Sequence, residues 1–158
     1  MQLQSISPPS IIVTHGSSQQ FMPPAPLKVR DFLEWFQNIQ MPDDIDWLII
    51  GDFNLIRRPE VRNKEGGDAN EIYLFNETIS RLGLVELPLV GRHFTWTNKQ
   101  ASPLLERLDS FFTSAAWTIK FPNTTVKSLV METLDHWPCV IEISTKISKN
   151  RLFICENF

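Results

Sequence analysis

This sequence has few cysteines, no long apolar run and no surplus of basic residues. Two cysteines among 158 residues are too few for a disulfide framework. No stretch approaches the ~20 apolar residues of a membrane span, and the start lacks the basic and apolar segments of a signal peptide. The formal net charge of −3 lacks the basic surplus typical of proteins that coat nucleic acid. These absences predict a soluble, intracellular protein that contacts no membrane.

What the sequence does contain is the composition of one globular domain. Apolar residues make up 42% and charged residues 21%, and eleven Phe and five Trp predict an aromatic core. We expect an irregular start over residues 1–10, a domain over residues 11–144 and a tail over residues 145–158. Cys139 lies in an apolar run, so a buried thiol is favoured over a catalytic or metal-binding role.

Hydrophobic periodicity predicts helices that alternate with strands in the first half of the chain, then strands in succession. An apolar helical stripe begins near Leu27 and ends at Pro42. A second helix is indicated by the capping-box spacing of Asp68 and Glu71, and Gly83 suits the position after its last turn. This order favours an α/β sandwich with mixed sheets over a parallel doubly wound sheet. Expected strands cover residues 11–14, 47–50, 94–97, 107–112, 124–129 and 139–143.

Asp52 and Asn54 stand two residues apart, just beyond the apolar run 47–50. In an extended chain this spacing directs both side chains to the same side. The carboxylate can bind a metal or orient an attacking water, and the amide can hold a phosphate oxygen. Asp and Asn are also common turn formers, so a plain turn is the alternative.

Two further positions carry groups suited to phosphate chemistry. Asp135 and His136 supply a metal ligand beside an acid/base group, although such a dipeptide also occurs on ordinary surfaces. Asp109 lies in the otherwise apolar stretch 108–112, where a charge is costly unless it is paired. The alternative for Asp109 is a strand-end residue that faces solvent.

A basic cluster precedes the second expected helix. Its members are interleaved with Glu60 and Glu65, so a solvated loop is favoured over a phosphate-binding patch. The cluster consists of Arg57, Arg58, Arg62 and Lys64.

In combination, these motifs resemble the endonuclease/exonuclease/phosphatase superfamily, the DNase I-like enzymes. WLIIGDFN, residues 47–54, is similar to the motif that supplies a catalytic Asp and Asn. LLERLDSFF, residues 104–112, resembles the strand motif whose aspartate orients the catalytic histidine. LDHWP, residues 134–138, resembles the closing Ser-Asp-His motif. Intervening stretches such as FNETISRLGLVELPLVGRHFTWTN are similar to endonucleases of plant LINE-type (non-LTR) retrotransposons, so the resemblance covers nearly everything from Trp47 onward.

The resemblance implies magnesium-dependent hydrolysis of a DNA phosphodiester. Asp52 would position or deprotonate the attacking water, and Asn54 would hold the scissile phosphate. His136 would stabilise the charge on the phosphate, with Asp109 fixing the imidazole. Asp135 would be the metal ligand, with Asp52 as a second candidate, for Mg²⁺ or alternatively Mn²⁺; no small-molecule cofactor is implied. The implied fold is α+β, a partial four-layer α/β sandwich with two mixed sheets and outer helices.

This sequence also departs from the family pattern. The family's amino-terminal portion, with its early Asn and its principal metal-binding Glu, has no counterpart here. Residues His15 to Ser18 replace a tyrosine-containing loop, and Leu134 replaces the motif serine. We therefore expect a fragment of a retroelement protein, of the kind associated with a reverse transcriptase, with weakened Mg²⁺ binding. Two functions remain open: a working phosphodiesterase, nuclear if the retroelement role is retained, and an inactive remnant that at most binds nucleic acid or a partner.

Overall fold

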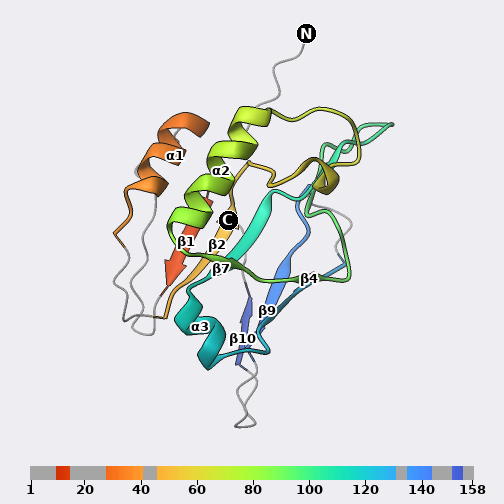
Figure 1. Cartoon of the computed structure of the whole chain (residues 1–158). Coiled ribbons are helices and arrows are strands. Elements are labelled where there is room, and N and C mark those ends of the chain that lie inside the picture. The colour runs from red at the N-terminus through yellow and green to blue at the C-terminus, as the bar shows by residue number, and fades with distance from the viewer. Residues whose placement is uncertain (1–9, 15–27, 41–45, 131–134, 144–150, 155–158) are drawn as a thin grey trace.

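The computed structural model describes residues 10–14, 28–40, 46–130, 135–143 and 151–154 (Figure 1). These residues form a mixed α+β structure in which helices, one sheet and a second sheet are layered. Residues 1–9 of the expected irregular start lie outside the described residues, and its last residue, Ser10, is instead the first residue of a strand. His15 to Ser18, Leu134 and most of the expected tail also lie outside the described residues.

The first sheet has four strands in the order β1-β2-β7-β3. One of its inner strands is β2, Leu48–Asp52. Both faces of β2 are covered, one by the helices and the other by the second sheet, so its first residues form a continuous apolar run in the sequence. The strand was expected to end at Ile50 but continues to Asp52, which is paired with Asp109 of β7. It lies between β1 (Ser10–Thr14) and β7 (Asp109–Thr113), and β7 pairs on its other side with β3 (Val85–Glu86).

Two helices cover one face of this sheet. They are α1, Val29–Gln37, and α2, Ala69–Arg81, which lie side by side in Figure 1. Helix α1 ends at Gln37, well before Pro42. Helix α2 begins where expected, because the Asp68 carboxylate accepts hydrogen bonds from the backbone N–H groups of Asn70 and Glu71. The core beneath them consists of Phe32, Leu33, Phe36, Trp47, Ile49, Phe53, Leu55, Phe75, Ile79, Leu84 and Phe112.

The second sheet has the strand order β10-β9-β8-β4 and packs against the other face of the first. Its strands are β4 (Leu89–Val90), β8 (Thr125–Ser128), β9 (Cys139–Ile143) and β10 (Arg151–Ile154). Strand β10 falls within the segment expected to be a tail, yet it pairs with β9. The core between the sheets contains Leu48, Ile50 and Phe111 from the first and Val126, Cys139 and Ile141 from the second.

Both sheets were expected to be mixed, and this is correct for only one of them. All pairings in the first sheet are antiparallel among the described residues. In the second sheet β4 runs parallel to β8, while the remaining pairs are antiparallel. Helix α3, Ala115–Lys120, was not expected from the sequence; its Trp117 closes one end of the core between the sheets.

Leu87 and Pro88 carry the chain from the first sheet to the second. Leu87 N–H donates to Phe111 O in the first sheet, at 2.8 Å between N and O. Pro88 O accepts from Val126 N–H in the second sheet, at 3.2 Å. Strands β3 and β4 therefore form one short crossing that belongs to both sheets.

A small antiparallel ribbon extends beyond the end of the first sheet. It contains β5, Trp96–Thr97, and β6, Leu105–Glu106. A short 3₁₀ helix, Pro59–Val61, lies earlier in the chain, before α2. The expected strand 94–97 is shorter than predicted, and its threonines are more buried than its aromatic residues. Thr95 is fully buried, whereas Trp96 is only partly buried. None of the helices in the described ranges is long and apolar enough to cross a membrane.

Candidate active site

The end of the first sheet brings together three ionisable side chains that are distant in sequence. Asp52, the last residue of β2, lies directly opposite Asp109, the first residue of β7. His136 bridges them. Its Nδ1 lies 3.0 Å from Asp109 Oδ2, and its Nε2 lies 3.6 Å from Asp52 Oδ2. The contact between Asp109 and His136 that the sequence led us to expect is therefore present.

The Asp52-Phe53-Asn54 segment is a turn in which the two candidate site residues contact each other. Asn54 adopts a left-handed backbone conformation with φ of 52°, which asparagine tolerates better than most residues. Its N–H donates to Asp52 Oδ1 at 2.9 Å, and its side-chain amide donates to Asp52 Oδ2 at 3.2 Å. Turn and site are therefore not exclusive alternatives here, because the turn fixes the carboxylate and the amide in one place.

Asp52 is a buried carboxyl group with a raised pKa. Burial and, to a smaller extent, the adjacent Asp109 carboxylate raise its pKa, His136 and Asn54 offset part of this rise, and the resulting pKa is about 6. The pKa of Asp52 is therefore close to physiological pH, which is where a general base works best. A group of this kind can accept a proton from water.

His136 is held in one orientation by Asp109. Burial lowers the pKa of His136, but the Asp109 hydrogen bond and the Asp109, Asp52 and Asp135 charges outweigh it, so the pKa is raised above 6.5. Because a carboxylate only accepts hydrogen bonds, Nδ1 carries the proton that points to Asp109. Nε2 then faces Asp52 and the open side of the site.

Asp135 differs from the other candidates because its side chain is exposed. Its carbonyl oxygen accepts a hydrogen bond from Thr97 N–H at 2.9 Å, which attaches it to the ribbon. Asp135, His136 and Asn54 all line an open cavity of about 700 Å³. The structure therefore gathers the five expected site residues, with Asp135 at the solvent side.

A hard cation such as Mg²⁺ has few ligands here. Among the described residues, no group of three or more His, Cys, Asp or Glu side chains is arranged to hold a metal. However, Mg²⁺ in proteins is often held by one or two carboxylates, and water and phosphate oxygens complete its shell. Asp135 and Asp52 offer oxygen donors of the right kind, although Asn54 already bonds both oxygens of Asp52. The set fits a weakly held, water-rich ion.

Sequence reasoning missed Thr95. Its fully buried hydroxyl accepts hydrogen bonds from the N–H groups of Leu108 and Asp109, at 3.1 and 3.0 Å. Its carbonyl oxygen accepts from Trp137 N–H at 2.9 Å. A single threonine therefore ties the strand of Asp109 to the segment of His136. No pattern in the sequence distinguishes it from an exposed strand threonine.

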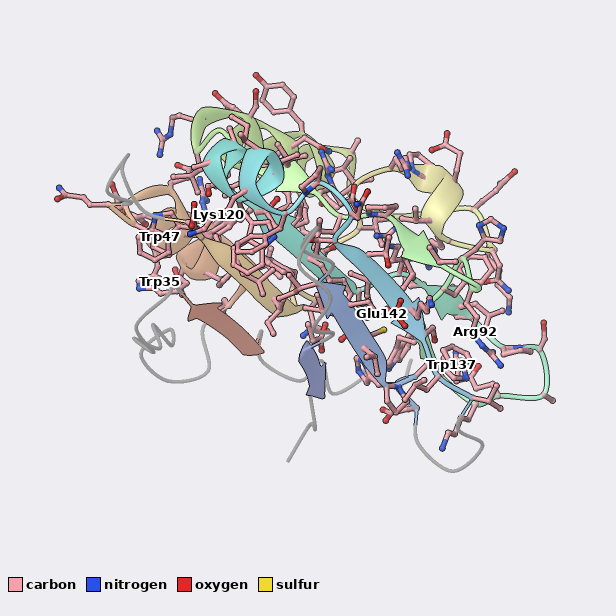
Figure 2. The ribbon with its side chains drawn as sticks, turned by 90° about the horizontal axis from the view of Figure 1, so that it is seen from below. Trp35, Trp47, Arg92, Lys120, Trp137 and Glu142 are labelled. Atoms are coloured by element: carbon pink, nitrogen blue, oxygen red, sulfur yellow. The ribbon has the colours of Figure 1, made fainter. Side chains whose placement is uncertain are left out.

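Trp137, the residue after His136, was also not anticipated. Figure 2 shows Arg92 and Trp137 side by side, and the Arg92 guanidinium lies 5.1 Å from the centroid of the indole ring. A stacked arginine limits the movement of the ring beneath it. The contact adds a second anchor to the segment that carries His136.

The basic cluster proves to be largely a set of structural contacts. Arg57 bonds Glu86 and Arg62 bonds Glu106, each at 2.6 Å between nitrogen and oxygen. Lys64 donates to the carbonyl oxygen of Ser102. The favoured solvated loop is therefore correct only in part, because Arg58 and Lys64 are exposed whereas Arg57 and Arg62 form ion pairs within the protein.

Comparison of the chain with protein families, with curated proteins and with solved structures gave no match.

Proposed function

We propose that this chain carries a metal-dependent phosphodiester-hydrolysing site of the endonuclease/exonuclease/phosphatase type, with DNA as its substrate. The observation that carries the proposal is the His136 imidazole between Asp109 at 3.0 Å and Asp52 at 3.6 Å. A histidine oriented by one carboxylate and facing a second carboxylate whose pKa is raised to about 6 offers both a proton acceptor and a cationic donor. Hydrolysis of a phosphate ester needs both.

Each chain residue has a distinct task in this proposal. Asp52 accepts a proton from the attacking water, for which a pKa of about 6 is well suited at neutral pH. The Asn54 amide holds a non-bridging oxygen of the scissile phosphate. His136 donates from Nε2 to the phosphate as charge develops, because Asp109 occupies Nδ1 and supports the imidazolium form.

Mg²⁺, with Mn²⁺ as an alternative, would be held by Asp135 with Asp52 as a second ligand. When bound, it would supply charge neutralisation at the phosphate oxygens. The cavity beside the site supports the need for a cation. It is lined by four carboxylates, Asp68, Glu71, Glu106 and Asp135, against the basic residues Arg62 and Lys99. A polyanion approaching this surface meets net negative charge unless a cation is present.

We also propose that the fold is a partial DNase I-like sandwich of retrotransposon ancestry. The order of the motifs around Asp52, Asp109 and His136 supports this, as does the packing of two four-stranded sheets face to face beneath α1 and α2. The resemblance to plant LINE-type endonucleases then makes a DNA nick that primes reverse transcription the ancestral reaction. A nuclear location would follow only if that role is retained.

A plasmid-nicking assay tests the activity. Supercoiled DNA incubated with the protein and Mg²⁺ should convert to the open circle, and EDTA should stop the reaction. Asp52→Asn should lower the rate by about a hundredfold or more, because it removes the proton acceptor. Asp31→Asn, which alters an exposed carboxylate on α1, is the matched control and should leave the rate unchanged. Equal nicking by the wild type and Asp52→Asn would contradict the proposal.

A second candidate function is binding without hydrolysis. It is favoured by the small number of metal ligands among the described residues, since a site with one exposed carboxylate holds Mg²⁺ poorly. In that case DNA or another partner binds with the same affinity in Mg²⁺ and in EDTA. Asp52→Asn then changes neither binding nor the intact plasmid, which separates this remnant from a working phosphodiesterase.

A further inference from the structure

Four residues form one row across the ribbon and end at His136. Arg62 pairs with Glu106, Glu106 pairs with Trp96, and Trp96 pairs with His136. Directly opposed residues on neighbouring strands project to the same face, with their Cβ atoms about 4.5–5.5 Å apart. All four side chains line the same cavity. The row therefore links the charged loop to the proposed catalytic histidine through a single layer of side chains.

The far end of the row is an enclosed ion pair. Arg62 Nη1 lies 2.6 Å from Glu106 Oε1, and their side chains are only 21% and 12% exposed. Burial raises the pKa of Glu106, and the Arg62 charge and hydrogen bond oppose the rise. Arg62 therefore stabilises the ionised form of Glu106.

The backbone around this ion pair is fixed on both sides. Asn63 N–H donates to Leu105 O, and Arg107 N–H donates to Val61 O, so the loop runs as an additional strand beside β6. The Asn63 side chain then donates to Pro103 O and accepts from Leu105 N–H. These bonds leave the loop little freedom to slide along the ribbon.

The near end of the row holds the reacting groups. Thr97 N–H donates to Asp135 O, and Trp137 N–H donates to Thr95 O, which places the segment on either side of His136 against β5. Thr95 also bonds the N–H of Asp109. The segment of His136 is bonded to the backbone of Thr95 and Thr97, whereas Asp109 is bonded to the Thr95 side chain. A displacement of β5 would therefore move His136 and Asp109 by different amounts.

We propose that the Arg62–Glu106 ion pair is a positioning element for the site, acting through Trp96 on His136. The pair fixes Glu106 of β6 against the loop, and Trp96 of β5, the register partner of Glu106, carries that position to the histidine so that Nδ1 stays within reach of Asp109. The inference rests on the proposed function for its catalytic consequence. Its structural part concerns only how His136 is held.

The test uses Arg62→Met, Glu106→Met, the double variant R62M/E106M and the charge swap R62E/E106R in the full chain. The double variant replaces the pair by apolar groups of similar size and so avoids leaving a lone buried charge. Two signals are recorded by NMR without metal: the indole N–H of Trp96 and the ring C–H of His136. Asp46→Asn/Lys120→Met, which removes an ion pair between α3 and the start of β2, is the matched control.

We expect both signals to move in the single and double variants, to return toward wild type in the charge swap, and to stay in place in the control. In the nicking assay the double variant should lower kcat about ten- to hundredfold with little change in KM, as expected when a reacting group is misplaced. Signals that do not move in the double variant would overturn the proposal. So would a charge swap that moves KM alone, because Arg62 would then contact the substrate directly.

Failure of the proposed function gives a different pattern. If the wild type does not nick DNA, the kcat comparison disappears while the Trp96 and His136 signals still report the coupling along the row. Moving signals without nicking would uphold the positioning role and reject hydrolysis. If the signals do not move but the wild type nicks DNA, hydrolysis is upheld and the positioning role is rejected.

Discussion

The helix-covered core and the ribbon at the site end are stabilised by opposite means. In the core, Phe53 lies at 5.2 Å from Phe75 and at 5.3 Å from Phe112 between ring centroids, and it is fully buried. The ribbon has strands of two residues, few apolar contacts, and ion pairs and threonine hydroxyls in their place. The core is stabilised by buried apolar area and close packing, whereas the ribbon is stabilised by individual ion pairs and hydrogen bonds. Stability and activity should therefore respond to different substitutions.

The largest expected effect is in the core. Phe53→Ala removes the ring that contacts Phe32, Phe36, Phe75 and Phe112, and it should lower the free energy of unfolding by about 3–5 kcal/mol. Denaturant unfolding followed by tryptophan fluorescence measures this loss. Ile119→Ala, at an 83% exposed position on α3, is the control and should change stability little. A loss below about 1 kcal/mol for Phe53→Ala would show that the core is not tightly packed.

A smaller effect of opposite sign is expected where the core meets the ribbon. The pKa of Asp52 is about 6 in the folded protein against 3.8 ordinarily, so its protonated form favours folding. That stability is fully present below pH 3.8 and is lost as the pH rises through about 6. Asp52→Asn should therefore match the wild type at low pH and exceed it by about 3 kcal/mol at pH 8.

The measurement is the difference in unfolding free energy between Asp52→Asn and the wild type across this pH range. The difference cancels the titration of groups far from Asp52, whereas the pKa of His136, which the Asp52 charge raises, is followed separately in both proteins by NMR. A variant less stable than the wild type at pH 8 would mean that Asp52 is stabilised as the carboxylate, against the effect of its burial.

The smallest expected effect lies at the ribbon end. Asp109→Asn removes the negative charge beside His136 that, with those of Asp52 and Asp135, opposes the effect of burial, so the pKa of His136 should fall below its wild-type value. The stabilisation from this pair is present below pH 6.5 and fades as the pH rises through the raised pKa. An NMR titration of the His136 ring measures the change. Identical titration curves for the two proteins would reject the pairing.

The sequence predicted best what depends on local periodicity. Helix α2 was predicted from its cap at Asp68, its apolar spacing and Gly83, which has φ of 62° as a residue after a helix end requires. Strand β2 was predicted from its apolar run, because burial on both faces leaves no alternation to misread. In both cases the determining residues are neighbours in the chain.

The sequence did not predict elements whose partners are distant. Strands β3, β4, β5 and β6 have two residues each, too few to show any period. Thr95 is buried because its hydroxyl bonds Leu108 and Asp109, which its own neighbours do not reveal. Asp52, Asp109 and His136 could be brought together in advance only by the order of the family motifs. The Arg62–Glu106 pair had no such guide and was absent from the expected site.

The crossing at Leu87 and Pro88 has a consequence for how the molecule opens. One of these residues bonds Phe111 in the first sheet and the other bonds Val126 in the second, with no residue between them. Neither sheet can separate from the other without breaking the crossing, so they do not behave as independent cooperative units. Hydrogen exchange should therefore give the amides of Leu87 and Val126, which donate the two bonds of the crossing, the same opening free energy, equal to that of global unfolding.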